Sequence, residues 1–135
     1  MPEREAVIAG VAEADEMGRV PDKNVFQLQA EATTNALADS GLDRDQVEGV
    51  FVQGSGYRQR FHFPQVAVSE YLGIDPVVSS SNDMGGSSSY GHLLYAKLAI
   101  EAGIIDTALI TYGSTSYTDR RSETVSTFSE GPELN

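Results

Sequence analysis

The stretch VVSSSNDMGGSSSYGHLLYAKLAIEAG, residues 77–103, decides how the rest of the chain is organised. It begins as a β-branched run, passes through two glycines and three serines, and continues with helical spacing. A glycine turn between a strand and a helix N-terminus can present a reactive side chain or hold an anion, because free N–H groups and the positive end of the helix dipole point outward there. The apolar residues that follow fall on more than one helical face, which predicts a helix buried between two layers. They are Leu93, Leu94, Ala96, Leu98, Ala99 and Ile100.

Strand and helix patterns alternate on both sides of this stretch. Strands are predicted at residues 6–12, 49–53, 77–80 and 107–112, and helices at residues 25–40 and 64–72. Asn24 and Gln27 have the spacing of a capping box, while Gly41 and Gly73 are placed to end the two helices. Such alternation predicts an α/β fold with three α-β-α layers, a mainly parallel sheet and helices on both of its faces.

Composition limits the classes of function. The chain has 135 residues, enough for one domain with a core, and a formal net charge of −11, which argues against nucleic acid as a partner. No apolar run is long enough for a membrane span, and the first twenty residues lack the pattern of a signal peptide, so the expected location is the cytoplasm. There is no cysteine, which excludes disulfides, thiolate metal sites and a thiol nucleophile.

The order of these motifs resembles the thiolase superfamily, especially its sterol-carrier-protein-type and lipid-transfer-type branches, which are acetyl-CoA acetyltransferase-like. Ala96, Ile100 and Gly103 match the family's pattern at the end of its central helix. Residues 106–113 (DTALITYG) match the strand that follows. The resemblance covers residues 6 to about 116. It implies the N-terminal half of a thiolase fold, with a domain at residues 1–113 and the start of a loop region or a disordered tail at residues 114–135.

The family resemblance implies a function in acyl-CoA and lipid metabolism, but the position of the family's cysteine nucleophile falls on Gly86. The implied activity is therefore part of a carbon–carbon bond-cleaving enzyme of the retro-aldol type, or of an acyltransferase-like enzyme. This chain alone is expected to be inactive. The alternative is a non-catalytic module that binds acyl-CoA or lipid, or that joins another subunit. The implied substrate is a coenzyme A thioester, and no tightly bound cofactor and no metal are expected.

The candidate site residues lie in two glycine-containing segments. Ser87 and Ser88 are weak candidates for a nucleophile, and Ser87 to Ser89 are more simply explained as caps of the helix N-terminus. His62 and His92 have no spacing typical of metal ligands and are explained as a loop and a packed histidine. Residues expected to contact the substrate are Gly85, Gly86, Ser87 and Ser88, with Tyr57, Arg58 and Arg60 from the loop after the second strand.

The strand that enters the glycine turn is also the expected dimer interface. In the thiolase family this strand pairs with its two-fold mate, and here it consists of small hydroxyl residues that allow close approach of two backbones. The expected partner is a second copy of the chain, or a different chain that supplies the second thiolase half. The interface residues are Val77, Val78, Ser79, Ser80 and Asn82.

Overall fold

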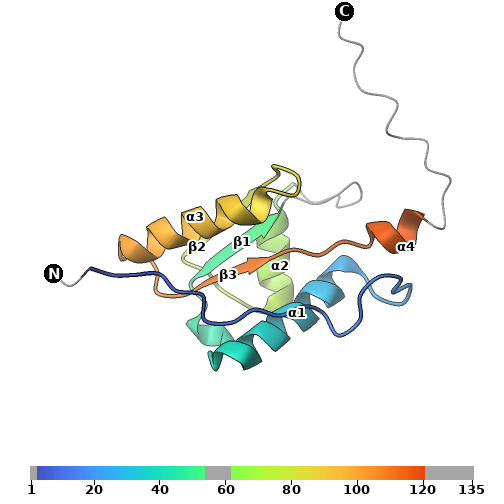
Figure 1. Ribbon diagram of the computed structural model, residues 1–135, viewed down its shortest axis with the longest axis horizontal. Coiled ribbons are helices and arrows are strands. Elements are labelled where there is room, and N and C mark those ends of the chain that lie inside the picture. The colour runs from blue at the N-terminus through green and yellow to red at the C-terminus, as the bar shows by residue number, and fades with distance from the viewer. Residues whose placement is uncertain (1–2, 54–61, 121–135) are drawn as a thin grey trace, which may run out of the picture.

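The computed structural model describes residues 3–53 and 62–120 (Figure 1). Its centre is a parallel sheet of three strands in the order β2-β1-β3, where β1 is Gly49–Gln53, β2 is Val78–Asn82 and β3 is Ala108–Thr111. The helices are α1 (Val25–Ser40), α2 (Pro64–Leu72), α3 (Ser88–Glu101) and α4 (Ser116–Arg120), with a 3-10 turn at Arg44–Gln46. The predicted alternation of strands and helices is confirmed.

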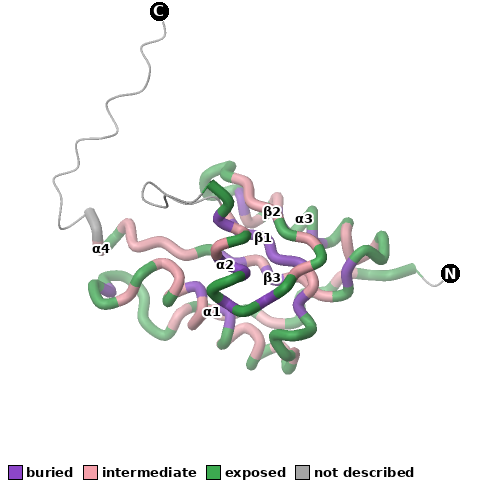
Figure 2. Tube along the Cα trace, turned by 180° about the vertical axis from the view of Figure 1, so that it is seen from behind, coloured by how far each residue is buried: buried purple, intermediate pink, exposed green. Residues whose placement is uncertain are grey.

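The sheet is covered on both faces, because successive side chains of β1 point in opposite directions. Val50 and Val52 are fully buried in a core shared with α1 and α2, whereas Phe51 is buried on the other face against α3. Figure 2 shows the buried segments gathered around β1. The structure therefore has the three α-β-α layers that the sequence predicts.

The ends of α1 and α2 follow from local sequence. The Asn24 side chain accepts a hydrogen bond from the Gln27 N–H, and the Gln27 side chain accepts one from the Asn24 N–H, at 3.0 and 2.8 Å. Gly41 and Gly73 end the two helices in the left-handed conformation, with φ of 72° and 67°. The capping box and both glycine stops are confirmed.

The N-terminal run at residues 6–12 does not form the predicted strand. It lies instead on α1, where a Cβ built on Gly10 would come 2.5 Å from the Ala36 carbonyl oxygen. The Val11 N–H donates to the Asp39 carboxylate at 2.9 Å, so the backbone is held by a helix side chain and not by a neighbouring strand. An apolar run can be extended without being paired, and here the prediction was wrong.

The prediction that α3 is buried between two layers is also wrong for the described residues. One face, made by Ser88, His92 and Ala96, is buried against the sheet. The other face is apolar and open, because nothing in residues 3–53 and 62–120 covers it. Its exposed side chains are Tyr90 (76%), Leu93, Leu94, Tyr95 and Leu98.

The segment after β3 contains α4, within the range for which a loop was expected. It is tied to the N-terminal part of the chain, since the Val20 N–H donates to the Thr118 hydroxyl at 3.0 Å. None of the helices in the described ranges is both long enough and apolar enough to span a bilayer.

Candidate functional site

The turn from Asn82 to Ser88 joins β2 to α3 at the carboxyl end of the sheet, where parallel α/β folds bind ligands. The Asp83 carboxylate accepts a hydrogen bond from the Gly85 N–H at 2.9 Å and so closes the first part of the turn. Gly85 has φ of +61°, a conformation that residues with a side chain rarely adopt. The glycine is therefore required by the backbone of the turn.

Ser88 fixes the inside of this turn. Its hydroxyl is fully buried, accepts a hydrogen bond from the Met84 N–H and donates one to the Gly85 carbonyl, both at 2.8 Å. The Gln53 side chain, at the end of β1, donates to the same carbonyl at 3.0 Å. Because the hydroxyl both accepts and donates a hydrogen bond within the turn, Ser88 holds the turn backbone.

Ser87 occupies the N-cap position of α3 but makes no side-chain capping bond. The interpretation of the serines as helix caps is therefore wrong for Ser87, because the buried Ser88 binds the turn backbone in its place. Ser87 is exposed and remains a side chain that a ligand at the turn could meet.

Gly86, the position at which the sequence resemblance predicts a nucleophile in related proteins, is exposed and open. A Cβ built there meets no atom within 4 Å, and its φ is not in the left-handed region. A side chain could be present without distortion, so the packing does not require glycine. The position precedes a helix of 14 residues, whose first N–H groups and dipole favour a negatively charged oxygen.

His92 lies one turn further along α3, on its buried face. It is 1% exposed, and its ring centroid is 6.0 Å from that of Phe51. Neither ring nitrogen has a hydrogen-bond partner within residues 3–53 and 62–120. Burial lowers the pKa of His92 below its usual 6.5, because the charged form loses its water. The explanation of His92 as a packed histidine agrees with this position.

Asn82 was predicted only as an interface residue, but its side-chain oxygen is buried at the base of the turn and has no hydrogen-bond partner among the described residues. Its amide nitrogen lies 3.6 Å from the place a Cβ on Gly91 would occupy. The sequence signal that could have identified it is the polar residue at the end of β2, immediately before the glycine turn.

The other predicted site residues are those of the loop after β1 and those of the expected dimer interface. Tyr57, Arg58 and Arg60 lie outside the described residues. The predicted interface run is at the edge of the sheet that the described residues form, since β2 is paired there with β1 alone and Val77 is 70% exposed. The Val78 N–H donates to the Glu48 carbonyl at 3.1 Å. Since backbone groups alternate in direction along a parallel strand, those of Ser79 and Ser81 face the open edge.

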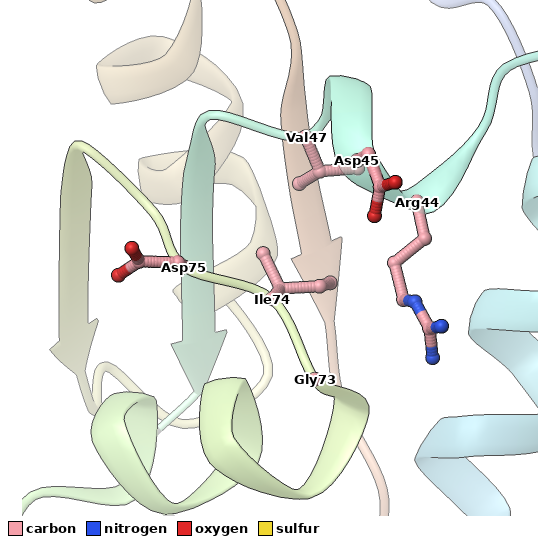
Figure 3. A pocket seen from close by; sticks show the side chains of 6 residues that line it. All are labelled: Arg44, Asp45, Val47, Gly73, Ile74 and Asp75. Atoms are coloured by element: carbon pink, nitrogen blue, oxygen red, sulfur yellow. The ribbon is translucent and has the colours of Figure 1, made fainter.

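A hollow of about 180 Å³ lies at the opposite end of the sheet from the turn (Figure 3). Within it, Arg44 donates to the Leu72 carbonyl at 3.0 Å, which satisfies the end of α2. This hollow is smaller than most ligand pockets. The guanidinium of Arg44, which lines it, already donates to the end of α2, so we assign the hollow a structural role. Among the residues described, no three His, Asp or Glu side chains are grouped as a metal site would need. The lining residues are Arg44, Asp45, Val47, Gly73, Ile74 and Asp75.

Sequence comparison alone does not identify a family. No family model matches the chain. A stretch of 78 residues is 36% identical to a chaperone protein HscA homolog of Delftia acidovorans, but this match covers 47% of the chain and 12% of that protein. So short a share of the relative does not show membership of its family.

Comparison with solved structures is more informative. Cerulenin-bound OleA of Xanthomonas campestris matches with a TM-score of 0.74 at 15% identity, over 89% of this chain and 47% of that one. An acetyl-CoA acetyltransferase of Syntrophomonas wolfei matches with 0.68 at 19% identity, over 80% and 28%. An aldolase named Ltp2-ChsH2(DUF35) matches with 0.72 at 23% identity, over 84% and 28%.

The chain therefore spans between 28% and 47% of the length of these three structures. At sequence identities this low, the matches show a shared fold and nothing more specific. The parallel sheet with helices on both faces agrees with that fold. The structural neighbours are thiolase-fold proteins, and this chain has the same α/β fold.

Proposed function

We propose that the chain is a cysteine-free, thiolase-like component of acyl-CoA metabolism, in which the turn at residues 83–88 holds the thioester carbonyl of a coenzyme A ester. The observation that carries the proposal is Gly86, which stands open at the N-terminus of α3. The turn below it is rigidly held by Ser88 and Gln53. Gly85, Gly86 and Ser87 would line the carbonyl, and Tyr57, Arg58 and Arg60 would contact the rest of the ester.

The chemistry follows from the missing thiolate, since no acyl group can be transferred to glycine. In a retro-aldol step, a β-hydroxyacyl thioester gives its hydroxyl proton to a base and the bond between the α and β carbons breaks. The β carbon leaves as a ketone or aldehyde, and the electron pair moves to the thioester as an enolate that then takes up a proton. The helix N-terminus would stabilise the enolate oxygen. The base would come from a chain that completes the enzyme.

The first test separates this chemistry from acyl transfer. The purified chain is incubated with acetyl-CoA and its intact mass is measured, beside a Gly86→Cys variant. We expect no acyl adduct on the original chain and an acetyl adduct on the variant, because a thiolate at a helix N-terminus has a lowered pKa. An adduct on any residue of the original chain would contradict the cysteine-free proposal.

The second test concerns binding at the turn. Acetyl-CoA is titrated against the original chain, Gly86→Leu and Gly86→Ala, with circular dichroism as a check of folding. Because a Cβ at position 86 meets nothing, both variants should fold, and only the larger side chain should obstruct the carbonyl. Equal binding by all three chains would place the ester elsewhere.

A second candidate function is a non-catalytic module that binds acyl-CoA or lipid, or that joins another subunit. It is favoured by the open apolar face of α3, which is larger than a scattering of single surface residues. A partner that supplies a second thiolase-like half would cover this face. In this case a β-hydroxyacyl-CoA would bind without being cleaved when that partner is added.

The oligomeric state can be tested with variants at two surfaces, the open edge of β2 and the apolar face of α3. Light scattering would compare the original chain with Ser79→Pro, whose lost N–H faces the open edge of β2, and with Leu94→Lys on α3. A homodimer through β2 predicts that Ser79→Pro is a monomer and Leu94→Lys a dimer. The reverse result assigns the interface to α3. A monomer of the original chain at micromolar concentration contradicts the homodimer.

A further inference from the structure

The carboxyl end of the sheet presents polar side chains to α3, beneath the glycine turn. Gln53 follows Phe51 by two residues and therefore points to the same face of the sheet, where Phe51 packs against α3. Asn82 is the partner of Gln53 in the register of β1 and β2 and points the same way. Gln53 is bonded to the Gly85 carbonyl at 3.0 Å, whereas the buried oxygen of Asn82 has no hydrogen-bond partner among the described residues.

Met84 and Gly91 show where the Asn82 side chain lies on α3. A Cβ built on Gly91 would overlap the Met84 methyl group and would lie 3.6 Å from the Asn82 amide nitrogen. The Met84 side chain therefore folds back over the helix at a residue without a side chain, and the Asn82 amide lies beside it. Because His92 follows Gly91, Asn82 and His92 lie in the same interface between the sheet and the first two turns of α3.

His92 is the buried histidine of this interface, and it points toward the turn. Side chains of a helix lean toward its N-terminus, so the imidazole lies over Ser88, four residues earlier on the same buried face. A neutral imidazole has one N–H that donates and one nitrogen that accepts, whereas the amide oxygen of Asn82 only accepts. Buried polar atoms in folded proteins are normally paired. His92 therefore has the donor that Asn82 lacks, and neither group has another partner in the part of the chain that the structure describes.

We infer that His92 is a positioning residue of the glycine turn: its imidazole N–H donates to the Asn82 side-chain oxygen when a thioester carbonyl occupies the turn. This hydrogen bond would join the end of β2 to α3 beneath Gly86. Ser88 and Gln53 hold the middle of the turn, and the new bond would hold its beginning, so that less freedom is lost when the carbonyl binds. By linkage, a ligand that favours the paired state binds more tightly because of the pair. The inference rests on the proposed function, because it concerns how the same turn is prepared for the ester.

Acetyl-CoA binding by variants of the full chain tests the role of the imidazole. His92→Leu keeps a buried side chain without the N–H, and it should weaken binding roughly tenfold. His92→Gln restores a donor and should bind within roughly threefold of the original chain. Thr33→Val is the matched control, because it also removes a buried polar atom without a partner among the described residues, on α1 at the other face of the sheet. It should bind acetyl-CoA as the original chain does.

A double variant distinguishes a bonded pair from two independent contributions. If His92 and Asn82 are bonded to each other, His92→Leu combined with Asn82→Ala should weaken binding no more than either single change does. Losses that add would overturn the inference, as would a His92→Gln chain that binds as weakly as His92→Leu. Circular dichroism checks that each variant is folded.

The hydrogen bond itself is observed by nuclear magnetic resonance with His92 intact, which avoids any change at a buried position. In His62→Gln, His92 is the only histidine of the chain, so the signals of its labelled ring nitrogens are assigned directly. Acetyl-CoA should move the imidazole N–H signal downfield and slow its exchange with water. A signal that bound acetyl-CoA leaves unchanged contradicts the inference.

Gly86→Leu distinguishes failure of this inference from failure of the proposed function. Weaker acetyl-CoA binding by Gly86→Leu but not by His92→Leu would overturn the inference alone and leave the proposed function intact. If neither variant weakens binding, the ester lies elsewhere and both proposals are wrong.

Discussion

The two helical layers of this protein are built differently. On one face of the sheet, α1 begins with a capping box, α1 and α2 both end at a left-handed glycine, and the two helices enclose a core of seven buried residues. On the other face, α3 has no side-chain cap, has three buried residues in its core, and exposes an apolar outer side. The second layer is anchored to the sheet but leaves its apolar outer side uncovered by the described residues. The following variants test that difference.

The largest effect is expected at the anchor of the α3 layer. Phe51→Ala removes a ring that is 2% exposed, so it should lower the free energy of unfolding by about 3–5 kcal/mol. Phe63→Ala, where the ring is 67% exposed, is the matched control and should cost less than about 1 kcal/mol. Urea unfolding followed by circular dichroism measures both. Similar losses for the two variants would mean that α3 is not anchored through Phe51.

The next effect compares glycines in the two layers. Gly10→Ala forces a Cβ against the backbone of α1, and we expect a loss of about 1–3 kcal/mol in the free energy of unfolding. Gly86→Ala meets no atom and should be neutral, or stabilising by about 0.4–1 kcal/mol. Thermal melts of the two variants give the comparison. A stable Gly10→Ala protein would contradict the packing of the N-terminal segment on α1.

The buried histidine of the α3 layer predicts a dependence of stability on pH. Burial lowers the pKa of His92 in the folded state, so below the usual 6.5 the unfolded chain takes up a proton that the folded chain does not. The free energy of unfolding should then fall with falling pH, by at most about 1.4 kcal/mol per pH unit, and be fully retained above that value. His92→Leu should flatten the curve between about pH 5 and 7.

The exposed His62 supplies the control for this measurement. His62→Gln should keep the slope that His92→Leu removes. If His92→Leu leaves the slope unchanged, the pH dependence belongs to other groups and the histidine is not desolvated as described.

The smallest effect concerns the two helix N-termini. Asn24→Ala removes the capping box of α1 and should cost about 1 kcal/mol, whereas Ser87→Ala removes no capping bond and should cost less than about 0.5 kcal/mol. Chemical unfolding of the two variants measures both losses in the free energy of unfolding. An equal loss would show that Ser87 caps α3 in solution.

Features set by neighbouring residues could be predicted from the sequence. The capping box of Asn24, the stops at Gly41 and Gly73, and the strand at Gly49–Gln53 all depend on local chemistry or on short periodic patterns. The parallel three-layer arrangement follows from their order. The glycine turn was also located correctly, because its strand, glycines and helix are contiguous.

Features set by distant contacts could not be predicted. An apolar run such as residues 6–12 has the same sequence pattern whether or not a strand lies beside it. Its lack of strand pairing could therefore not be predicted from the sequence. The role of Ser88 depends on how the turn folds back, which brings its hydroxyl to Met84 and Gly85. On α1 the two fully buried residues are the polar Gln29 and Thr33, while the apolar Phe26, Ala30 and Leu37 are only partly buried against the core, an order that hydrophobic periodicity does not predict.

The order of the sheet has a consequence for how the chain folds. The central strand is the first of the three in sequence, and its second neighbour, β3, begins 59 residues after it begins, at Ala108 against Gly49. The ion pair between Arg4 and Asp106 joins residues that are even further apart in the sequence, by 102 positions. Pairings this distant are slow to form, so we expect a low folding rate for a chain of this length. During synthesis β1 would remain half-paired until the strand at Ala108 has left the ribosome.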